Sequence, residues 1–294
     1  MAIEVVASDG RRLAVEDSGN PDGYPIVLLH GTPGSRFGPS PRAGVLYRLG
    51  IRLISFDRPG YGHSERRPDR TVSDVASDVE AIAAALGLGR FGVVGRSGGA
   101  PHALACAALL PHRITRAAAL VGLAPPGAEG LHWFDGMHES NIVEYGVART
   151  GRIAVAARLT VAAEQIRADP FSKVLGLREQ VPESDRKVVA DDGIRRMLVR
   201  NFAEGLRESA DGWVDDVVAL TSAWGFDPAD ITVPTLLWHG EDDVFSPAGH
   251  TSWLGSRIPG ALVRIQPDAA HFGALDVLPE VLLWLRSAEA PDPG

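Results

Sequence analysis

The segment Gly95-Arg96-Ser97-Gly98-Gly99 places a serine among glycines, where an apolar, β-branched run gives way to an alanine-rich one. A Gly-x-Ser-x-Gly sequence between a strand and a helix is typical of a nucleophile elbow. In such an elbow the serine occupies a strained turn, and small neighbours let strand and helix approach closely. The pentapeptide alone is common by chance, but its expected strand-turn-helix context favours catalysis. We therefore predict that Ser97 is a nucleophile.

A serine hydroxyl is a weak nucleophile at neutral pH, so the prediction requires a general base and an acid that orients the base. These residues should follow in the order serine, acid, histidine. Eight of the nine histidines lie at strand ends, in helices, in an early turn or in the central helical block. His271, in "QPDAAHFGALD", lies on the loop between the last expected strand and the final helix. We predict that His271 is the base.

The acid is expected in the loop "GEDDVFSP", which follows the apolar run "VPTLLWHG". This loop carries three consecutive carboxylates, Glu241, Asp242 and Asp243. The loop after the preceding run, "VGLAPPGAEG", has no carboxylate before Glu129. Only one of the three acids can face the histidine, and the spacing alone does not choose among them.

The negative charge that develops on a substrate carbonyl needs two preorganised N–H donors. The Gly98 amide, at the start of the expected helix, is one candidate. The turn-forming loop "HGTPGS" at residues 30–35 follows the apolar run "PIVLL" and can present the Thr32 amide as the second. We predict an oxyanion hole formed by Thr32 and Gly98.

The elements that must position these residues follow from hydrophobic patterning. Six short apolar runs are continuous rather than alternating, which is typical of strands covered on both faces of a parallel sheet. They span residues 25–31, 51–57, 90–95, 114–122, 233–240 and 261–267.

Segments with helical character lie between these runs, at residues 71–87, 98–110 and 274–288. The first has Thr71 or Ser73 as a possible N-cap and Gly87 as a C-cap. This alternation predicts right-handed βαβ crossovers and a doubly wound α/β sheet. The segments "IEVVAS" and "RRLAVEDSG", joined by Asp9-Gly10, predict a hairpin at one edge of the sheet.

Residues 127–226 show amphipathic helical patterning without a convincing strand. We interpret them as a helical lid (cap) domain, inserted into a catalytic domain of residues 1–126 and 227–294. The lid would cover the carboxyl edge of the sheet, where α/β folds bind ligands. Apolar and aromatic residues in its first part are expected either to line a substrate pocket or to pack the lid onto the core. They are Trp133, Phe134, Met137 and His138.

Five motifs, "HGTPGS", "FDRPGYGHS", "GRSGG", "GEDDVFSP" and "AAHFGALD", resemble the α/β-hydrolase superfamily in order and approximate spacing. They look most like its lidded branch of proline iminopeptidase-like and small esterase-like enzymes. The resemblance covers residues 1–126 and 227–288. It implies an α/β-hydrolase fold with eight mostly parallel strands and helices on both faces, and no cofactor or metal. In that family the acid stands three residues after the glycine that ends its strand, which selects Asp243.

Two departures bear on the activity. Proline iminopeptidases commonly have Gly-Gly-Ser-Trp-Gly at the elbow, whereas this chain has Arg96 and Gly98 there. Arg96 is expected to tie down a loop or, alternatively, to meet an anionic group. The lid carboxylates that would bind a substrate amino group in proline iminopeptidases cannot be placed in this sequence either, which disfavours aminopeptidase activity. Related dehalogenases and epoxide hydrolases carry Asp where this chain has Ser97, so the resemblance disfavours those reactions.

The formal net charge of −8 over 294 residues, with 29 scattered Lys and Arg, argues against a nucleic-acid partner. No apolar run is long enough to span a membrane, and the first residues lack the pattern of a secretion signal. The single cysteine, Cys106, suits a reducing compartment. We therefore expect a cytoplasmic protein that acts on a small molecule; the oligomeric state stays open.

These observations predict a serine hydrolase that cleaves an ester or lactone of a small, fairly apolar molecule through an acyl-enzyme. An amidase or proline iminopeptidase-like aminopeptidase is the first alternative. A non-hydrolytic binding protein that reuses the scaffold is the second, because fold does not determine function.

Overall fold

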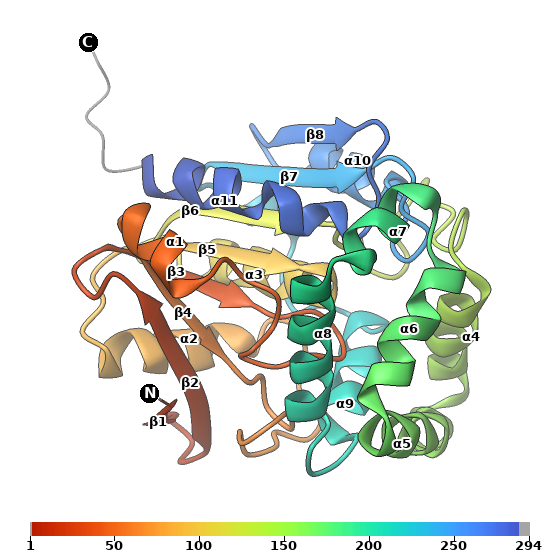
Figure 1. Cartoon of the computed structure of the whole chain (residues 1–294). Helices are drawn as coiled ribbons and strands as arrows, with labels where there is room; N and C mark the ends of the chain where they lie inside the picture. Colours follow the sequence, from red (N-terminus) through yellow and green to blue (C-terminus); the bar gives the residue numbers. More distant parts are fainter. Residues whose placement is uncertain (1, 288–294) are drawn as a thin grey trace.

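The computed structural model describes residues 2–287. Its centre is an eight-stranded sheet in the order β1-β2-β4-β3-β5-β6-β7-β8 (Figure 1). Strand β2 runs antiparallel to β1 and β4, and the other neighbours pair in parallel. The expected mostly parallel α/β sheet is therefore confirmed. The strands are β1 (Ala2–Val6), β2 (Arg12–Gly19), β3 (Tyr24–Leu29), β4 (Ile51–Phe56), β5 (Phe91–Arg96), β6 (Ile114–Leu120), β7 (Thr235–Gly240) and β8 (Leu262–Gln266).

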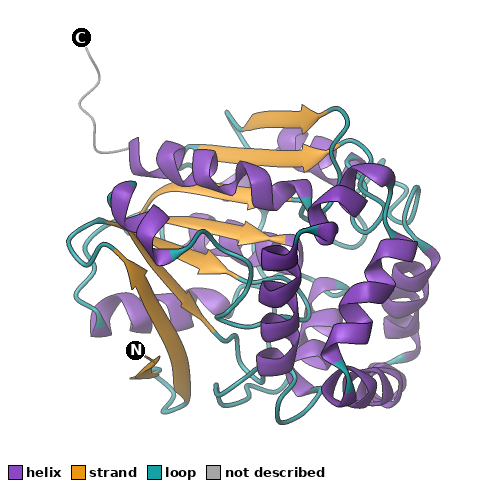
Figure 2. Cartoon of the chain, viewed as in Figure 1, coloured by secondary structure: helices purple, strands orange, loops and turns teal. Residues whose placement is uncertain are grey.

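Helices cover both faces of this sheet (Figure 2). Helices α1 (Ala43–Arg48) and α11 (Gly273–Arg286) pack on one face, where Leu46 and Leu278 join the buried side chains of the central strands. Helices α2 (Val75–Ala85), α3 (Ala100–Leu109) and α10 (Gly249–Arg257) pack on the other. This double cover explains why the strand sequences are continuously apolar.

Six further helices lie between β6 and β7 and stand beyond the carboxyl ends of the strands (Figure 1). We call them the helical segment: α4 (Glu139–Val147), α5 (Arg152–Ala168), α6 (Pro170–Gln180), α7 (Glu183–Ala190), α8 (Asp192–Gly205) and α9 (Asp211–Leu220). Their buried side chains, such as Leu159 and Val214, belong to the same hydrophobic core as one face of the sheet. The division into a catalytic domain and a lid of residues 127–226 stays a prediction.

The turns in the first third of the chain follow the expected chemistry in part. The hairpin of β1 and β2 is confirmed, with Gly10 at a φ of +88°. Gly87, at a φ of +64°, directly follows the C-cap of α2 and ends that helix as expected. The N-cap prediction was wrong: α2 begins after Asp74, and the hydroxyls of Thr71 and Ser73 bond to each other at 2.8 Å.

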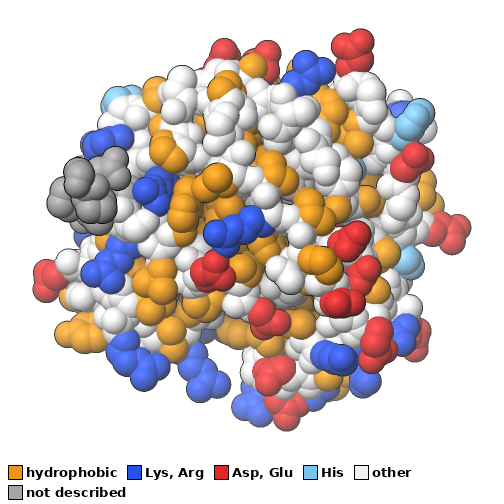
Figure 3. Space-filling model, turned by 90° about the horizontal axis from the view of Figure 1, so that it is seen from above, with side chains coloured by type: hydrophobic (Ala, Val, Ile, Leu, Met, Phe, Trp, Pro, Cys, Tyr) orange, Lys and Arg blue, Asp and Glu red, His pale blue; other side chains and the backbone are white. Residues whose placement is uncertain are grey.

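Strand β8 differs from its expected burial. All five of its residues are exposed, because β8 is an edge strand that pairs only with β7. Figure 3 looks onto this side and shows hydrophobic side chains scattered among charged ones. Among residues 2–287, no helix is both long and apolar enough to cross a membrane.

Candidate active site

Ser97 occupies a sharp turn between strand β5 and helix α3. Its φ is +56°, a left-handed conformation that is strained for a residue with a side chain. The neighbouring glycines are required sterically. A Cβ on Gly95 would lie 2.1 Å from the carbonyl oxygen of Gly99, and a Cβ on Gly99 would lie 2.2 Å from that of Leu29. The glycines therefore allow the tight strand-turn-helix geometry that exposes the serine.

His271 and Asp243 meet at the carboxyl edge of the sheet. Asp243 lies in the loop after β7, and His271 lies in the loop between β8 and α11. The Nδ1–H of His271 donates to Asp243 Oδ2 at 2.8 Å, which leaves Nε2 as the ring nitrogen free to take a proton. Asp242 is exposed and accepts from the Ser184 hydroxyl instead, at 3.4 Å. Of the three consecutive acids, Asp243 is thus the one that contacts the histidine.

The Asp243 carboxylate is buried and held by several donors. Its Oδ1 accepts from the backbone N–H groups of Phe245 and Ser246, at 2.8 and 3.1 Å. Its Oδ2 also contacts His239 Nε2 at 3.1 Å. Burial acts to raise the pKa of Asp243, but the charge of His271 and the hydrogen bond from His239 outweigh it and hold the pKa well below its ordinary value. Asp243 is therefore ionised at neutral pH.

His239 is a site residue that the sequence reasoning set aside. It lies on β7, and its Nδ1 contacts the Thr251 hydroxyl at 2.7 Å, on helix α10. Through Nε2 it helps to hold the acid in place. The available signal in the sequence was its position: His239 lies near the end of the strand, four residues before Asp243.

The two amides expected in the oxyanion hole lie close together. A Cβ on Gly98 would lie 3.3 Å from the Thr32 amide nitrogen and 2.2 Å from Thr32 Oγ1, so the two backbones approach each other directly. The Gly98 carbonyl oxygen bonds to His102 Nδ1 at 2.8 Å. The Thr32 hydroxyl donates to Asp216 Oδ2 at 2.5 Å. Both residues are thus held by buried side chains.

Asp216, on helix α9, is the centre of a fully buried polar cluster below the loop of Thr32. Besides Thr32, its Oδ2 accepts from Arg58 at 2.5 Å and from the Tyr61 hydroxyl at 2.8 Å, and its Oδ1 accepts from Arg70 at 2.6 Å. We call these five residues the Asp216 cluster. Burial acts to raise the pKa of Asp216, but the two guanidinium groups outweigh it and hold the pKa well below its ordinary value.

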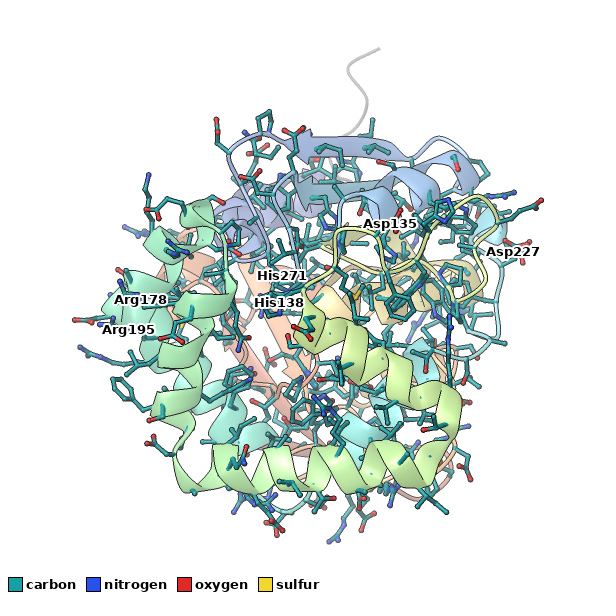
Figure 4. The ribbon with its side chains drawn as sticks, turned by 90° about the vertical axis from the view of Figure 1, so that its right-hand side faces the viewer. Asp135, His138, Arg178, Arg195, Asp227 and His271 are labelled. Atoms are coloured by element: carbon teal, nitrogen blue, oxygen red, sulfur yellow. The ribbon has the colours of Figure 1, made fainter. Side chains whose placement is uncertain are left out.

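A cavity of about 380 Å³ contains both Ser97 and His271 in its lining. Loops at the sheet edge contribute Gly31, Thr32 and Phe272. The helical segment supplies the other side with apolar and charged groups, including Glu144, Arg158, Lys173, Leu177, Phe202 and Trp213. In Figure 4 the labelled His271 lies where the helical segment meets the loops of the sheet. The predicted nucleophile and base therefore face one shared space of a size that suits a small molecule.

The lining of this cavity differs from the one expected. Trp133 and Phe134 line a second cavity, of about 270 Å³. The Trp133 indole N–H donates to the Ala124 carbonyl at 2.9 Å, which holds that ring in place. Met137 is 6% exposed and packs in the core. His138 begins α4, where its Nδ1 accepts from the Ser140 amide at 3.2 Å. None of these four side chains lines the cavity of Ser97.

The first curated relatives match only part of the chain. Proline iminopeptidase from Neisseria meningitidis is 38% identical over 105 residues, which cover 34% of this chain and only about a third (33%) of that relative's length. A non-heme haloperoxidase from Rhodococcus erythropolis is 27% identical over 281 residues, 91% of this chain and 92% of the relative.

Solved structures resemble the fold over its whole length. A putative aryl esterase from Burkholderia cenocepacia superimposes with a TM-score of 0.70 at 22% identity, covering 99% of this chain and 100% of the other. A thermophilic esterase from Thermogutta terrifontis gives 0.67 at 23% identity, with the same coverage. The alpha/beta hydrolase fold family matches residues 24–276, from β3 into α11. Because this match spans most of the chain, the protein belongs to the α/β-hydrolase fold family.

Proposed function

We propose that the protein is a serine hydrolase that cleaves an ester or lactone of a small molecule through an acyl-enzyme. Membership of the α/β-hydrolase fold family supports a hydrolase. The observation that carries the finer proposal is the 2.8 Å bond between His271 Nδ1 and Asp243 Oδ2, in a site where the same histidine and Ser97 line one cavity.

In this mechanism Ser97 Oγ attacks the substrate carbonyl carbon while His271 Nε2 takes the hydroxyl proton. Asp243 orients the imidazole and stabilises the imidazolium that forms. The Thr32 and Gly98 amides donate to the oxyanion, and a lost donor of this kind costs about 3 kcal/mol of barrier. His271 then protonates the leaving alcohol. A water molecule, deprotonated by the same nitrogen, attacks the acyl-enzyme and releases the acid and free Ser97.

The decisive variant is Ser97→Ala, assayed with 4-nitrophenyl esters. We expect kcat/KM to fall at least about 10⁴-fold, because no nucleophile remains. A fluorophosphonate probe should label the wild type and not this variant. Ser252→Ala, an exposed serine on α10, is the matched control and should keep full activity. Turnover retained by the Ser97→Ala protein would refute the mechanism, and a wild type that neither turns over nor reacts with the probe would favour a binding protein.

An aminopeptidase is the second candidate, and one carboxylate favours it. Glu144 lies in the cavity wall, where it accepts from the Trp213 indole N–H at 2.8 Å. A carboxylate there suits a substrate ammonium group, and the partial matches include proline iminopeptidases. Comparing amino-acid β-naphthylamides with short-chain esters separates the two candidates.

A further inference from the structure

Arg96 ends strand β5 and precedes Ser97 in the chain, and its side chain turns toward the same space. A methyl group on Gly31 would lie 3.5 Å from Ser97 Cβ and 3.8 Å from Arg96 Nη2, so both side chains lie beside Gly31. The guanidinium carbon also lies 6.0 Å from the ring centre of Phe272, which follows His271. Arg96 also lines the cavity. The guanidinium therefore lies near both the loop of Thr32 and the loop of the predicted base.

This partly exposed guanidinium lacks the partner that the buried arginines have. Arg58 and Arg70 each bond to Asp216, and Arg36 contacts Glu204 at 2.7 Å. Within residues 2–287, the Arg96 side chain has neither a hydrogen bond nor a carboxylate within 4.0 Å. The residue is partly exposed, and its five N–H donors stay available for a ligand.

Burial lowers the pKa of Arg96 to about 10, while the more distant charges of Asp185 and Asp243 favour its charged form. Arg96 therefore stays protonated at neutral pH. Both carboxylates have nearer partners: Asp185 accepts from the Phe272 amide at 2.8 Å, and Asp243 binds His271.

The charged side chains that line the cavity also favour an anionic ligand. Three cationic side chains line it, Arg96, Arg158 and Lys173, against a single carboxylate, Glu144. Burial raises the pKa of that carboxyl group. This excess of positive charge occurs in a protein whose formal net charge is −8. The side chains that line the cavity therefore carry an excess of positive charge, opposite in sign to the net charge of the whole molecule.

We propose that Arg96 binds a carboxylate of the substrate, so that the enzyme prefers esters or lactones carrying an anionic group near the scissile bond. The proposal rests on the serine hydrolase function and replaces the expected fairly apolar substrate with an anionic one. A planar guanidinium matches a carboxylate through two parallel N–H···O bonds. A carboxylate also brings one charge for the guanidinium that lies beside Ser97.

The test compares two substrates that differ in one charge: 4-nitrophenyl hydrogen adipate, whose free acid is ionised at pH 7.5, and its neutral methyl ester. We expect the wild type to favour the anion through a lower KM. Arg96→Gln should reduce the ratio of the two kcat/KM values by about 10- to 100-fold, the range of a charge-assisted hydrogen bond. Arg96→Lys should restore part of the ratio. The matched control is Arg178→Gln, because Arg178 is exposed on α6 and points outward in Figure 4.

The ratio of the two kcat/KM values distinguishes a role of Arg96 in substrate binding from a role in supporting the fold. If Arg96 merely supports the fold, for example through Asp185, its loss will lower turnover of both esters equally, and the unchanged ratio overturns the proposal. A wild type without preference for the anion overturns it as well. Calorimetry of monomethyl adipate binding to the Ser97→Ala protein, with and without Arg96→Gln, gives a readout without turnover. Anion binding that depends on Arg96 supports the proposal even if no ester is hydrolysed, and that outcome would refute only the hydrolase mechanism.

Discussion

Helix α9 contributes to two regions that differ in whether their charged side chains form ion pairs. Asp216 points into the Asp216 cluster, where four donors surround one carboxylate and no charge faces solvent. Three residues earlier on the same helix, Trp213 faces the cavity and bonds to Glu144. There Glu144 and Arg96 form no ion pair with each other or with another described residue within 4.0 Å. Charged groups that are paired inside the fold hold the backbone in place, whereas charged groups without an ion-pair partner at a cavity are available to a ligand.

Replacing a carboxylate by its amide separates these two roles, and the largest effect is expected at Asp216. In Asp216→Asn, Arg58 and Arg70 lose their shared counter-charge in a fully buried site. Breaking a buried ion pair in this way costs about 3–5 kcal/mol of unfolding free energy. We also expect ester turnover to fall at least about tenfold, because the Thr32 loop loses its anchor. Urea unfolding and esterase assays measure the two effects.

Asp211→Asn is the matched control for this experiment. Asp211 lies on the same helix, half exposed, and pairs with Arg66 at 3.0 Å. An exposed pair contributes less than about 1 kcal/mol, so little change is expected. Equal stability losses at Asp211 and Asp216 would show that burial of the Asp216 ion pairs does not make them more important to the fold.

An intermediate, pH-dependent effect is expected at Asp185, on helix α7. Burial raises its pKa to about 6 from 3.8, and its Oδ2 has no hydrogen-bond partner among residues 2–287. The folded state therefore binds the proton more tightly than the unfolded state. Protonated Asp185 therefore stabilises the folded state. This contribution is complete below about pH 4 and is lost as the pH rises through about 6.

Asp185→Asn removes this titration, while its amide oxygen can still accept from the Phe272 amide. The variant should be more stable than the wild type by about 1–2 kcal/mol at pH 8, and the difference should vanish near pH 4. Chemical unfolding across this pH range measures it. Glu183→Gln, an exposed acid on the same helix, should leave the wild-type pH profile intact. The same profile in the Asp185→Asn protein would show that this carboxyl does not titrate there.

The smallest effect on stability is expected at Glu144. Glu144→Gln keeps an acceptor for Trp213 and removes a carboxyl group whose pKa is raised by burial. We expect the unfolding free energy to increase by less than about 1 kcal/mol at pH 8, and this increase should disappear at low pH. If the enzyme is an aminopeptidase, this variant should selectively lose turnover of amino-acid β-naphthylamides relative to esters. Glu164→Gln, an exposed acid on α5, is the control. A stability loss as large as that at Asp216 would place Glu144 among the structural charges.

Most of the fold could be predicted because its signals are local. The continuous apolar strands, the β1–β2 hairpin and the elbow around Ser97 follow from burial on two faces and from backbone sterics, which neighbouring residues determine. Placing His271 and the loop of three acids required in addition that the carboxyl ends of parallel strands share one edge of the sheet. Only the resemblance to the α/β-hydrolase superfamily selected Asp243 within that loop. The exposure of β8 was missed, because an apolar run does not reveal whether its strand lies at the centre or the edge of a sheet.

The cavity wall could not be predicted for a related reason. The sequence by itself determined the sheet, the elbow and the order of serine, acid and histidine, because each depends on short-range patterning or strand order. Only the tertiary structure decided that Trp133 turns to a second cavity, that Asp216 anchors the loop of Thr32, and that Arg96 and Glu144 face the space beside Ser97. Those outcomes depend on how the helices of residues 139–220 pack over the sheet, which brings together side chains more than a hundred residues apart. Amphipathic patterning specifies that a helix buries one face, but it does not specify what that face meets.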